Sequence, residues 1–311
     1  MDTFKFAPAK FVPFRDTEVI ERVRKIKRED ITKHPNPEYH ITVLPDADVE
    51  IIWLTDMFYR IKTAADEGRQ YVMILPNPWS HYSMLAHMIN KFQVDCRKLY
   101  LIAMDEYANE DGVIAPDTWR FGFVYAMKNY LYYQIDPNLR PPESHVIGFT
   151  DKNINSFSQM IADLGGADMT YTGPGWTGHV AFFEPDAPET QASSLEEWMT
   201  YGARIVTLSP FTIAQNSLHG SFGKSGDLSA VPPRAATIGP ADVIACKFRI
   251  NLHTISVHGT STSWQRLTTR LATHGPVTPR VPDSLHQLLR TDVIISETIA
   301  QNIEPDWEKG Y

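Results

Sequence analysis

From residue 41 onward, short apolar runs alternate with stretches of helical periodicity, and this alternation limits the folds open to the chain. Residues 71–75 and 98–104 are nearly continuous apolar runs, as strands covered on both faces require. Between them, Leu85, Met88 and Ile89 recur at helical spacing. Strands that alternate with helices of this length favour crossover connections and a mostly parallel sheet. We therefore predict an α/β fold with three α/β/α layers and a mostly parallel, Rossmann-like sheet.

The same pattern places the individual elements. The predicted strands are residues 41–44, 71–75, 98–104, 169–172, 204–209, 251–258 and 292–296. The predicted helices lie between them: one capped by Asp46 and ending near Gly68, one capped by Ser80, one over residues 119–133, one over 154–164, and one after Gly259. No internal repeat or linker divides this region, so we expect residues 41–311 to form a single domain.

The first forty residues differ in character from the rest. Prolines and a polar stretch flank one predicted helix, residues 17–28, in which Val19, Val23 and Ile26 share an apolar face. The opposite face is basic, which is typical of a solvated surface and also of a phosphate or nucleic-acid site. The acidic balance of the chain favours the solvated surface. We expect residues 1–40 to form an N-terminal extension.

Charge and cysteine content exclude several classes of function. The chain has 37 acidic and 29 basic residues and a net charge of −8, so it lacks the electrostatic footprint of a nucleic-acid or anionic-membrane binder. Its two cysteines, Cys96 and Cys246, are too few for a disulfide framework or a thiolate metal cage. No apolar run approaches the roughly 20 residues of a membrane helix, and no signal peptide follows Met1. We expect a cytoplasmic protein without nucleic-acid or membrane partners.

In a sheet of this kind, functional residues gather at the carboxyl ends of the strands. Two adjacent carboxylates, Asp105 and Glu106, follow the strand over residues 98–104. A carboxylate at the rim of a crevice, partly shielded from water, gains a raised pKa and can serve as a general base. The spacing fits equally well with Asp105 as a simple cap of the next turn.

A second strand exit carries a glycine-rich segment, residues 173–185. Its three glycines, Gly173, Gly175 and Gly178, permit tight turns and close approach of the backbone to a ligand. His179 follows, and Glu184 lies five residues later. A carboxylate can orient a histidine and stabilise its protonated form, which suits proton transfer to and from a sugar ring oxygen. The alternative is a histidine bonded to the carbonyls of its own loop.

Together these two segments resemble the glucosamine-6-phosphate deaminase family, whose fold group also holds the 6-phosphogluconolactonases. The family has a Met-Asp-Glu-Tyr segment after a central strand, found here at residues 104–107. It also has a Gly-x-Gly-x-Asp-Gly-His-Ile-Ala-Phe-Asn-Glu-Pro segment, which residues 173–185 resemble, roughly seventy residues later. The resemblance continues downstream through residues 203–208 and the last two strands, and covers about residues 41–300.

The resemblance implies a ring-opening, isomerising deaminase of an amino-sugar phosphate that needs no metal or organic cofactor. In this family a histidine assists ring opening, an aspartate carries a proton between C2 and C1, and ammonia leaves as a ketose phosphate forms. By position, Asp105 would carry the proton, His179 would open the ring, Glu184 would be its carboxylate partner, and Arg204 would bind the phosphate through its guanidinium fork. The other substrate-binding residues implied are Ser80, Glu106, Gly175, Thr177, Gly178 and Thr262.

The chain departs from the family pattern around the expected phosphate site. Thr177 replaces an aspartate two residues before the histidine, and Trp176 replaces a small polar residue. Residues 76–81, Pro-Asn-Pro-Trp-Ser-His, replace a glycine- and threonine-rich phosphate loop, and prolines donate no backbone N–H. Thr262 stands where the family has a lysine, while Arg204 is retained. We expect weakened binding of a sugar phosphate.

Three functions fit these observations. The chain is an isomerase/deaminase with altered sugar specificity, a non-catalytic relative that binds a sugar, or a 6-phosphogluconolactonase-like hydrolase. Retention of Asp105, His179 and Glu184 favours the first. Thr177 counts against a lactonase too, since those enzymes also have an aspartate there. His81 and His258, near strand exits, are candidate replacement anion ligands. The small-molecule partner is a sugar or a sugar phosphate, and a homo-oligomer remains open.

Overall fold

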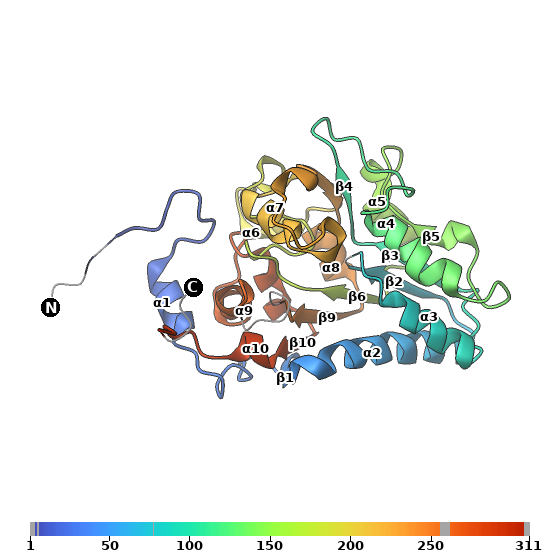
Figure 1. Cartoon of the computed structure of the whole chain (residues 1–311), viewed down its shortest axis with the longest axis horizontal. Helices are drawn as coiled ribbons and strands as arrows, with labels where there is room; N and C mark the ends of the chain where they lie inside the picture. The colour runs from blue at the N-terminus through green and yellow to red at the C-terminus, as the bar shows by residue number, and fades with distance from the viewer. Residues whose placement is uncertain (1–3, 5, 77, 256–261, 308–311) are drawn as a thin grey trace.

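The computed structural model describes residues 4, 6–76, 78–255 and 262–307 of the chain. Its main sheet contains seven strands: β1 (Tyr39–Leu44), β2 (Tyr71–Leu75), β3 (Leu99–Ala103), β5 (Val146–Ile147), β6 (Met169–Thr172), β9 (Phe248–His253) and β10 (Thr291–Ser296). Their order is β1-β10-β9-β6-β2-β3-β5, and every pairing is parallel. The predicted parallel sheet is therefore confirmed (Figure 1).

Helices cover both faces of this sheet. One face carries α2 (Asp46–Asp66), α3 (Tyr82–Lys91) and α4 (Phe123–Ala126), and the other carries α5 (Phe157–Asp163), α6 (Leu195–Met199) and α8 (Pro240–Ala245). The pleat of β2 explains the two cores: Met73 and Leu75 pack on the first set of helices, and Val72 and Ile74 pack on the second. The fold is thus the three-layer α/β/α arrangement.

A second, smaller sheet was not predicted. It pairs β4 (Asp105–Ala108), β8 (Arg234–Thr237) and β7 (Arg204–Thr207) in antiparallel fashion. The prediction that residues 204–209 join the parallel sheet is wrong, because an apolar run does not reveal its partner strand. The chain passes directly from β3 through Met104 into β4, so Asp105 lies where the two sheets meet.

Two predicted helix caps are also corrected. The N-cap of α2 is Pro45, and Asp46 is the first helical residue. The N-cap of α3 is His81 rather than Ser80, and no side chain caps this helix. Ser80 lies in the turn before the helix, where its carbonyl accepts the N–H and the hydroxyl of Ser83 at 3.2 and 3.0 Å.

The long helix predicted over residues 119–133 begins later and is irregular. It starts with α4, widens into a π-helical turn over Met127–Leu131 and ends in a 3₁₀ turn over Tyr132–Gln134. The start is fixed by Glu106, whose carboxylate accepts the backbone N–H groups of Phe123 and Val124 at 3.2 and 2.9 Å. Local periodicity could not show this distant cap.

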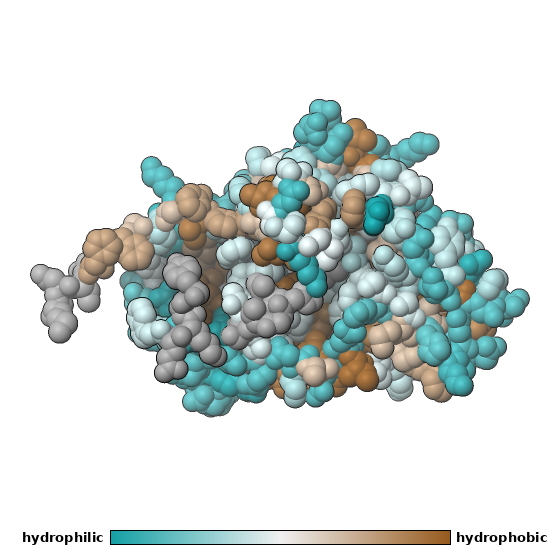
Figure 2. Space-filling view, viewed as in Figure 1, coloured by the Kyte–Doolittle hydropathy of each residue, from teal (hydrophilic) through white to brown (hydrophobic). Residues whose placement is uncertain are grey.

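The N-terminal segment packs on the last part of the chain. Its helix, α1 (Thr17–Arg24), lies beside α9 (Gln265–His274), where Val23 is fully buried against Leu271 and Ala272 (Figure 1). Before α1, Phe14 packs in the cluster shared by α1 and α9 and the Phe11 ring lies 5.9 Å from that of Phe211, whereas Phe4 and Phe6 are exposed on the part of the chain that extends from the body of the molecule (Figure 2). The division at residue 40 stays a prediction. A short helix, α10 (Glu297–Ala300), ends the described fold, and none of the described helices has the length and apolarity to cross a membrane.

Candidate active site

A small cleft opens at the carboxyl ends of the central strands, between the main sheet and α7 (Pro210–Ser217). Its walls come from the ends of β2, β6 and β9, from the start of β4, from the glycine-rich loop and from α7. Asp105, His179 and Gly175 all line it. The fold therefore brings together the two strand exits that the sequence singled out.

Asp105 is buried at the base of the cleft. Its Oδ1 accepts the backbone N–H of Phe182 at 3.0 Å, which also points at Thr237 Oγ1 at 3.0 Å. Ala181 adopts a positive φ of 51°, an uncommon conformation for a residue with a side chain, directly before Phe182. Burial raises the pKa of Asp105 to about 7, against the opposing effects of Thr237, the Phe182 N–H and His179. A carboxyl group with such a pKa can both take and return a proton near neutral pH.

His179 and Glu184 form a buried pair with two threonine hydroxyls. Nδ1 of His179 lies 3.4 Å from Glu184 Oε1 and 3.2 Å from the Oγ1 atoms of Thr177 and Thr212. Thr177 donates its hydroxyl to Glu184 Oε2 at 2.8 Å, and the N–H of Ser209 lies 3.3 Å from Oε1. Burial alone would raise the pKa of Glu184, but His179 and the threonine hydroxyls outweigh it and lower the pKa. The ionised carboxylate orients the imidazole.

At two positions of the glycine-rich loop, the structure leaves room for glycine alone. A side chain at Gly175 would meet Nε2 of His179 at 2.1 Å, so only glycine lets the loop backbone lie against the imidazole ring. Gly178 has a φ of +82°, and its carbonyl accepts the N–H of Asp283 at 2.9 Å. With Nδ1 facing Glu184, Nε2 is the ring nitrogen left on the side of Gly175 and the cleft.

Sequence reasoning missed the contribution of α7. Gln215 and Asn216 line the cleft, and Thr212 reaches His179 from the same helix. Gln215 Oε1 accepts the N–H of Trp176 at 2.7 Å, and Asn216 Nδ2 donates to the Tyr107 hydroxyl at 3.0 Å. These three polar residues share one buried face at i, i+3 and i+4 spacing, and that pattern was the available signal.

Glu106, expected to bind substrate, has another role. It is fully buried and does not line the cleft. Its carboxylate accepts hydrogen bonds from the N–H groups at the start of α4. Burial raises its pKa to about 7, although these backbone donors oppose the shift. Adjacent residues of a strand point to opposite sides, so Asp105 and Glu106 could not both face the cleft. We correct the assignment: Glu106 is a helix cap.

Arg204, expected to bind a phosphate, also lies outside the cleft. Its Nη1 donates to the carbonyl of Glu189 at 2.8 Å and its Nε to the carbonyl of Gly202 at 3.2 Å. The guanidinium sits 4.1 Å from the ring centroid of Tyr201. Burial lowers its pKa. The match of residues 203–208 to the family placed Arg204 on β7, but its register sends the side chain toward Tyr201.

Other residues expected to bind substrate or an anion also lie outside the cleft. Ser80 and Thr262 are exposed, and neither lines it. His81 pairs with Glu50 at the surface, 2.5 Å from Nδ1 to Oε1. The candidates at residues 258–261, and the predicted end of the strand at 256–258, lie outside the described residues.

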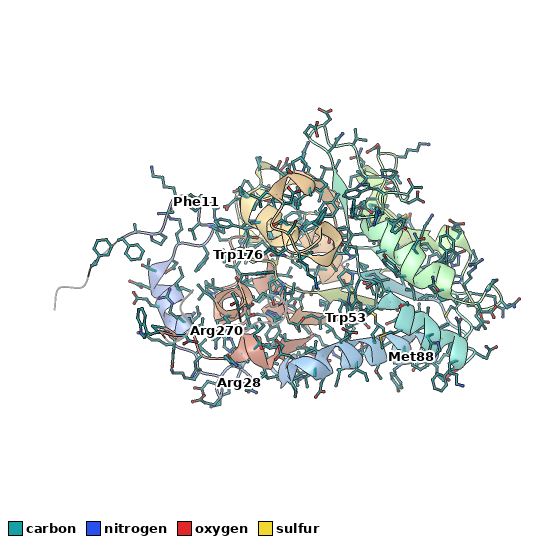
Figure 3. The ribbon with its side chains drawn as sticks, viewed as in Figure 1. Phe11, Arg28, Trp53, Met88, Trp176 and Arg270 are labelled. Atoms are coloured by element: carbon teal, nitrogen blue, oxygen red, sulfur yellow. The ribbon has the colours of Figure 1, made fainter. Side chains whose placement is uncertain are left out.

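The loop after β2 is filled by aromatic rings. Trp79 stacks on Trp53 of α2 with ring centroids 4.4 Å apart and an angle of 9° between the planes. The Tyr82 hydroxyl donates to the carbonyl of Pro76 at 2.7 Å. Figure 3 labels Trp53 at the side of the sheet covered by α2. Where the family pattern has a phosphate-binding loop, this chain thus has a packed stack of aromatic rings. Among the residues that the structure describes, no three His, Cys, Asp or Glu side chains are grouped to hold a metal ion.

Comparison with known proteins gives a consistent answer. No protein-family model matches the chain. A curated glucosamine-6-phosphate deaminase of Caenorhabditis elegans is 30% identical over 192 residues, which cover 60% of this chain and 64% of that relative. The chain is thus similar in sequence to the glucosamine-6-phosphate deaminases. The match spans less than two thirds of that relative's length.

Solved structures show the shared fold. A monomeric glucosamine-6-phosphate deaminase superposes with a TM-score of 0.63 at 18% identity, covering 84% of this chain and 98% of its own. The 6-phosphogluconolactonase from Trypanosoma cruzi gives 0.58 at 15% identity, covering 88% of this chain and 99% of its own. This chain thus has the fold that these deaminase and lactonase structures have in common.

Proposed function

We propose that this chain is a sugar isomerase/deaminase, in which Asp105 moves a proton between C2 and C1 of an open-chain amino sugar. The observation that supports this best is that a carboxyl group with a pKa of about 7 shares one cleft with a buried histidine–glutamate pair. The relationship to curated deaminases supports the same reaction.

His179 would open the sugar ring. Its Nδ1 is held by Glu184, so Nε2 takes the proton of the anomeric hydroxyl and returns a proton to the ring oxygen as the bond between C1 and that oxygen breaks. Glu184, with its lowered pKa, stays ionised and stabilises the imidazolium between the two transfers. The product of this step is the open-chain aldehyde.

Asp105 would carry out the isomerisation. Its carboxylate takes the C2 proton, and the electron pair of that bond forms a C1–C2 double bond as the carbonyl oxygen takes a proton from water. The proton then returns to C1, which leaves an imine at C2. Water adds to the imine, ammonia leaves, and a ketose remains. The N–H of Phe182 holds Asp105 in place through each transfer.

Ammonia release and deuterium uptake test this proposal together. The purified protein is incubated with amino sugars, free and phosphorylated, in deuterium oxide, and ammonia, ketose and deuterium at C1 are measured. The proposal predicts all three for at least one sugar, and none from Asp105→Asn. Sugar binding without any product would instead indicate a non-catalytic relative, and hydrolysis of a sugar lactone in a parallel assay would indicate a lactonase.

A further inference from the structure

The cleft around Asp105 provides no fixed positive charge. Among its lining residues that the structure describes there is no lysine or arginine. The stretches outside the description nearest to it in sequence, Asn77 and residues 256–261, contain none either. The basic side chains in the lining are the imidazoles of His179 and His219, and a histidine carries positive charge only when protonated. A phosphate dianion would meet no permanent cation here.

Backbone N–H groups of a loop and the N-terminus of a helix can also hold a phosphate, but next to this cleft both are blocked. Pro76 and Pro78, which follow β2 in the sequence, have no N–H to donate. The helix that follows, α3, has the imidazole of His81 and the carboxylate of Glu50 at its N-terminus, 2.5 Å apart. A second anion there would be repelled by Glu50.

The cleft wall formed at the ends of β2 and β9 suits an uncharged sugar ring instead of a phosphate. Trp53, Pro76, Pro78 and Leu252 give an apolar surface along the cleft. Trp53 Nε1 is buried and has no hydrogen-bond partner among the described residues. Because the face of this indole stacks on Trp79, its contribution to the cleft is the N–H, which a sugar hydroxyl can accept.

We propose that the substrate is an amino sugar without a phosphate group, an inference that rests on the proposed function above. Asp105 is the carboxyl group in the cleft lining, so it attracts the ammonium of an amino sugar and repels a phosphate. The amides of Gln215 and Asn216 and the hydroxyl of Thr254 are neutral groups of the kind that hydrogen-bond sugar hydroxyls. The charge of the cleft and the neutral polar groups of its wall thus favour the same class of ligand.

Direct comparison of two sugars tests this inference. Binding of glucosamine and of glucosamine 6-phosphate to the full chain is measured by calorimetry, alongside ammonia release from each. A charge-assisted contact changes affinity roughly tenfold to a hundredfold, and we expect at least the lower of these in favour of glucosamine. Inorganic phosphate should not compete. Tighter binding or faster turnover of the phosphorylated sugar would overturn the inference.

A lysine placed in the cleft gives a second test. Thr254 is half-buried in the lining, directly after β9, so Thr254→Lys adds the missing cation and Thr254→Met is a control of similar length without charge. Thr254→Lys should improve binding of glucosamine 6-phosphate about tenfold in low salt, and Thr254→Met should not. If both variants fold by circular dichroism and leave the ratio of the two affinities unchanged, the inference fails.

The two proposals fail in different ways. A preference for glucosamine in binding, with no ammonia from either sugar, would overturn the proposed deaminase reaction and support the substrate class. Ammonia release confined to glucosamine 6-phosphate would support the reaction and overturn the substrate class. Absence of binding and turnover for both sugars would overturn both.

Discussion

Thr177 donates its hydroxyl to Glu184 at 2.8 Å and stands 3.2 Å from Nδ1 of His179, so one neutral side chain joins the two members of the buried pair. At this position the resemblance to the deaminases leads to an aspartate. The hydroxyl keeps the hydrogen-bonded connection and removes one negative charge. Glu184 is therefore the one carboxylate in contact with His179 among the described residues.

Removing this hydroxyl should separate ring opening from the later steps. Thr177→Val keeps the shape of the side chain and leaves Glu184 Oε2 and His179 Nδ1 with one partner fewer, which costs about 1–3 kcal/mol of folding stability. Turnover of a cyclic amino sugar should fall more than turnover of an open-chain analogue, measured with the same ammonia assay. Thr177→Ser, which retains the hydroxyl, is the control. Equal losses on both substrates would remove Thr177 and His179 from ring opening.

Gly175 offers a steric test of the position of His179. A methyl group at Gly175 would lie 2.1 Å from His179 Nε2, so Gly175→Ala must displace the imidazole or the loop. We expect turnover to fall by at least about tenfold, within the range for misplaced catalytic groups. Gly220→Ala is the matched control, because its added carbon meets nothing within 4 Å. A Gly175→Ala protein with unchanged kinetics would contradict the assigned geometry.

The pH dependence of turnover follows from Asp105. Burial raises its pKa to about 7, and a general base acts only when deprotonated, so the rate with saturating sugar should rise as the pH increases through about 7. Asp105→Asn should lower the rate about 10²–10⁴-fold and remove this rise, since the amide accepts no proton. The measurement is the rate between pH 5 and 9. A wild-type rate that is flat across pH 7 would count against Asp105 as the base.

Asp105 should also shape the pH dependence of stability. Because the pKa is raised from 3.8 to about 7 in the folded chain, the folded state holds a proton that the unfolded state loses between these values. The contribution of Asp105 to stability is therefore fully present below about pH 4 and declines as the pH rises to 7. Between pH 5 and pH 8, the free energy of unfolding of Asp105→Asn should therefore rise relative to that of the wild type by roughly a few kcal/mol. Urea unfolding at both pH values measures this, and Glu106, whose pKa shifts in the same direction, is unchanged in both proteins.

The sequence predicted the parallel sheet from local patterns, whereas it was the resemblance to the deaminases that placed Asp105 and His179 in one site. Strand β2 and strand β6 begin and end at the predicted residues, and the glycine-rich loop carries its own geometry. The small antiparallel sheet was missed because β8 pairs with strands far away in the chain. For the same reason the sequence could not show that Glu106 caps α4 or that Arg204 turns toward Tyr201. Roles that depend on a partner distant in sequence are visible only in the folded chain.

Arg204 provides the last test, because its two assignments give opposite results. As a phosphate ligand it would affect affinity for the sugar, whereas in the structure it ties the loop carbonyl of Glu189 to β7 and stacks on Tyr201. We expect Arg204→Ala to leave the affinity for free and phosphorylated amino sugars within about twofold and to lower the free energy of unfolding by about 1–3 kcal/mol, because a partly buried carbonyl loses its charged donor. Arg204→Lys, which keeps a charge but cannot donate to both carbonyls or stack as a planar group, should recover part of the stability. Calorimetric binding and urea unfolding of the two variants distinguish the roles, and a loss of affinity confined to the phosphorylated sugar would return Arg204 to the phosphate site.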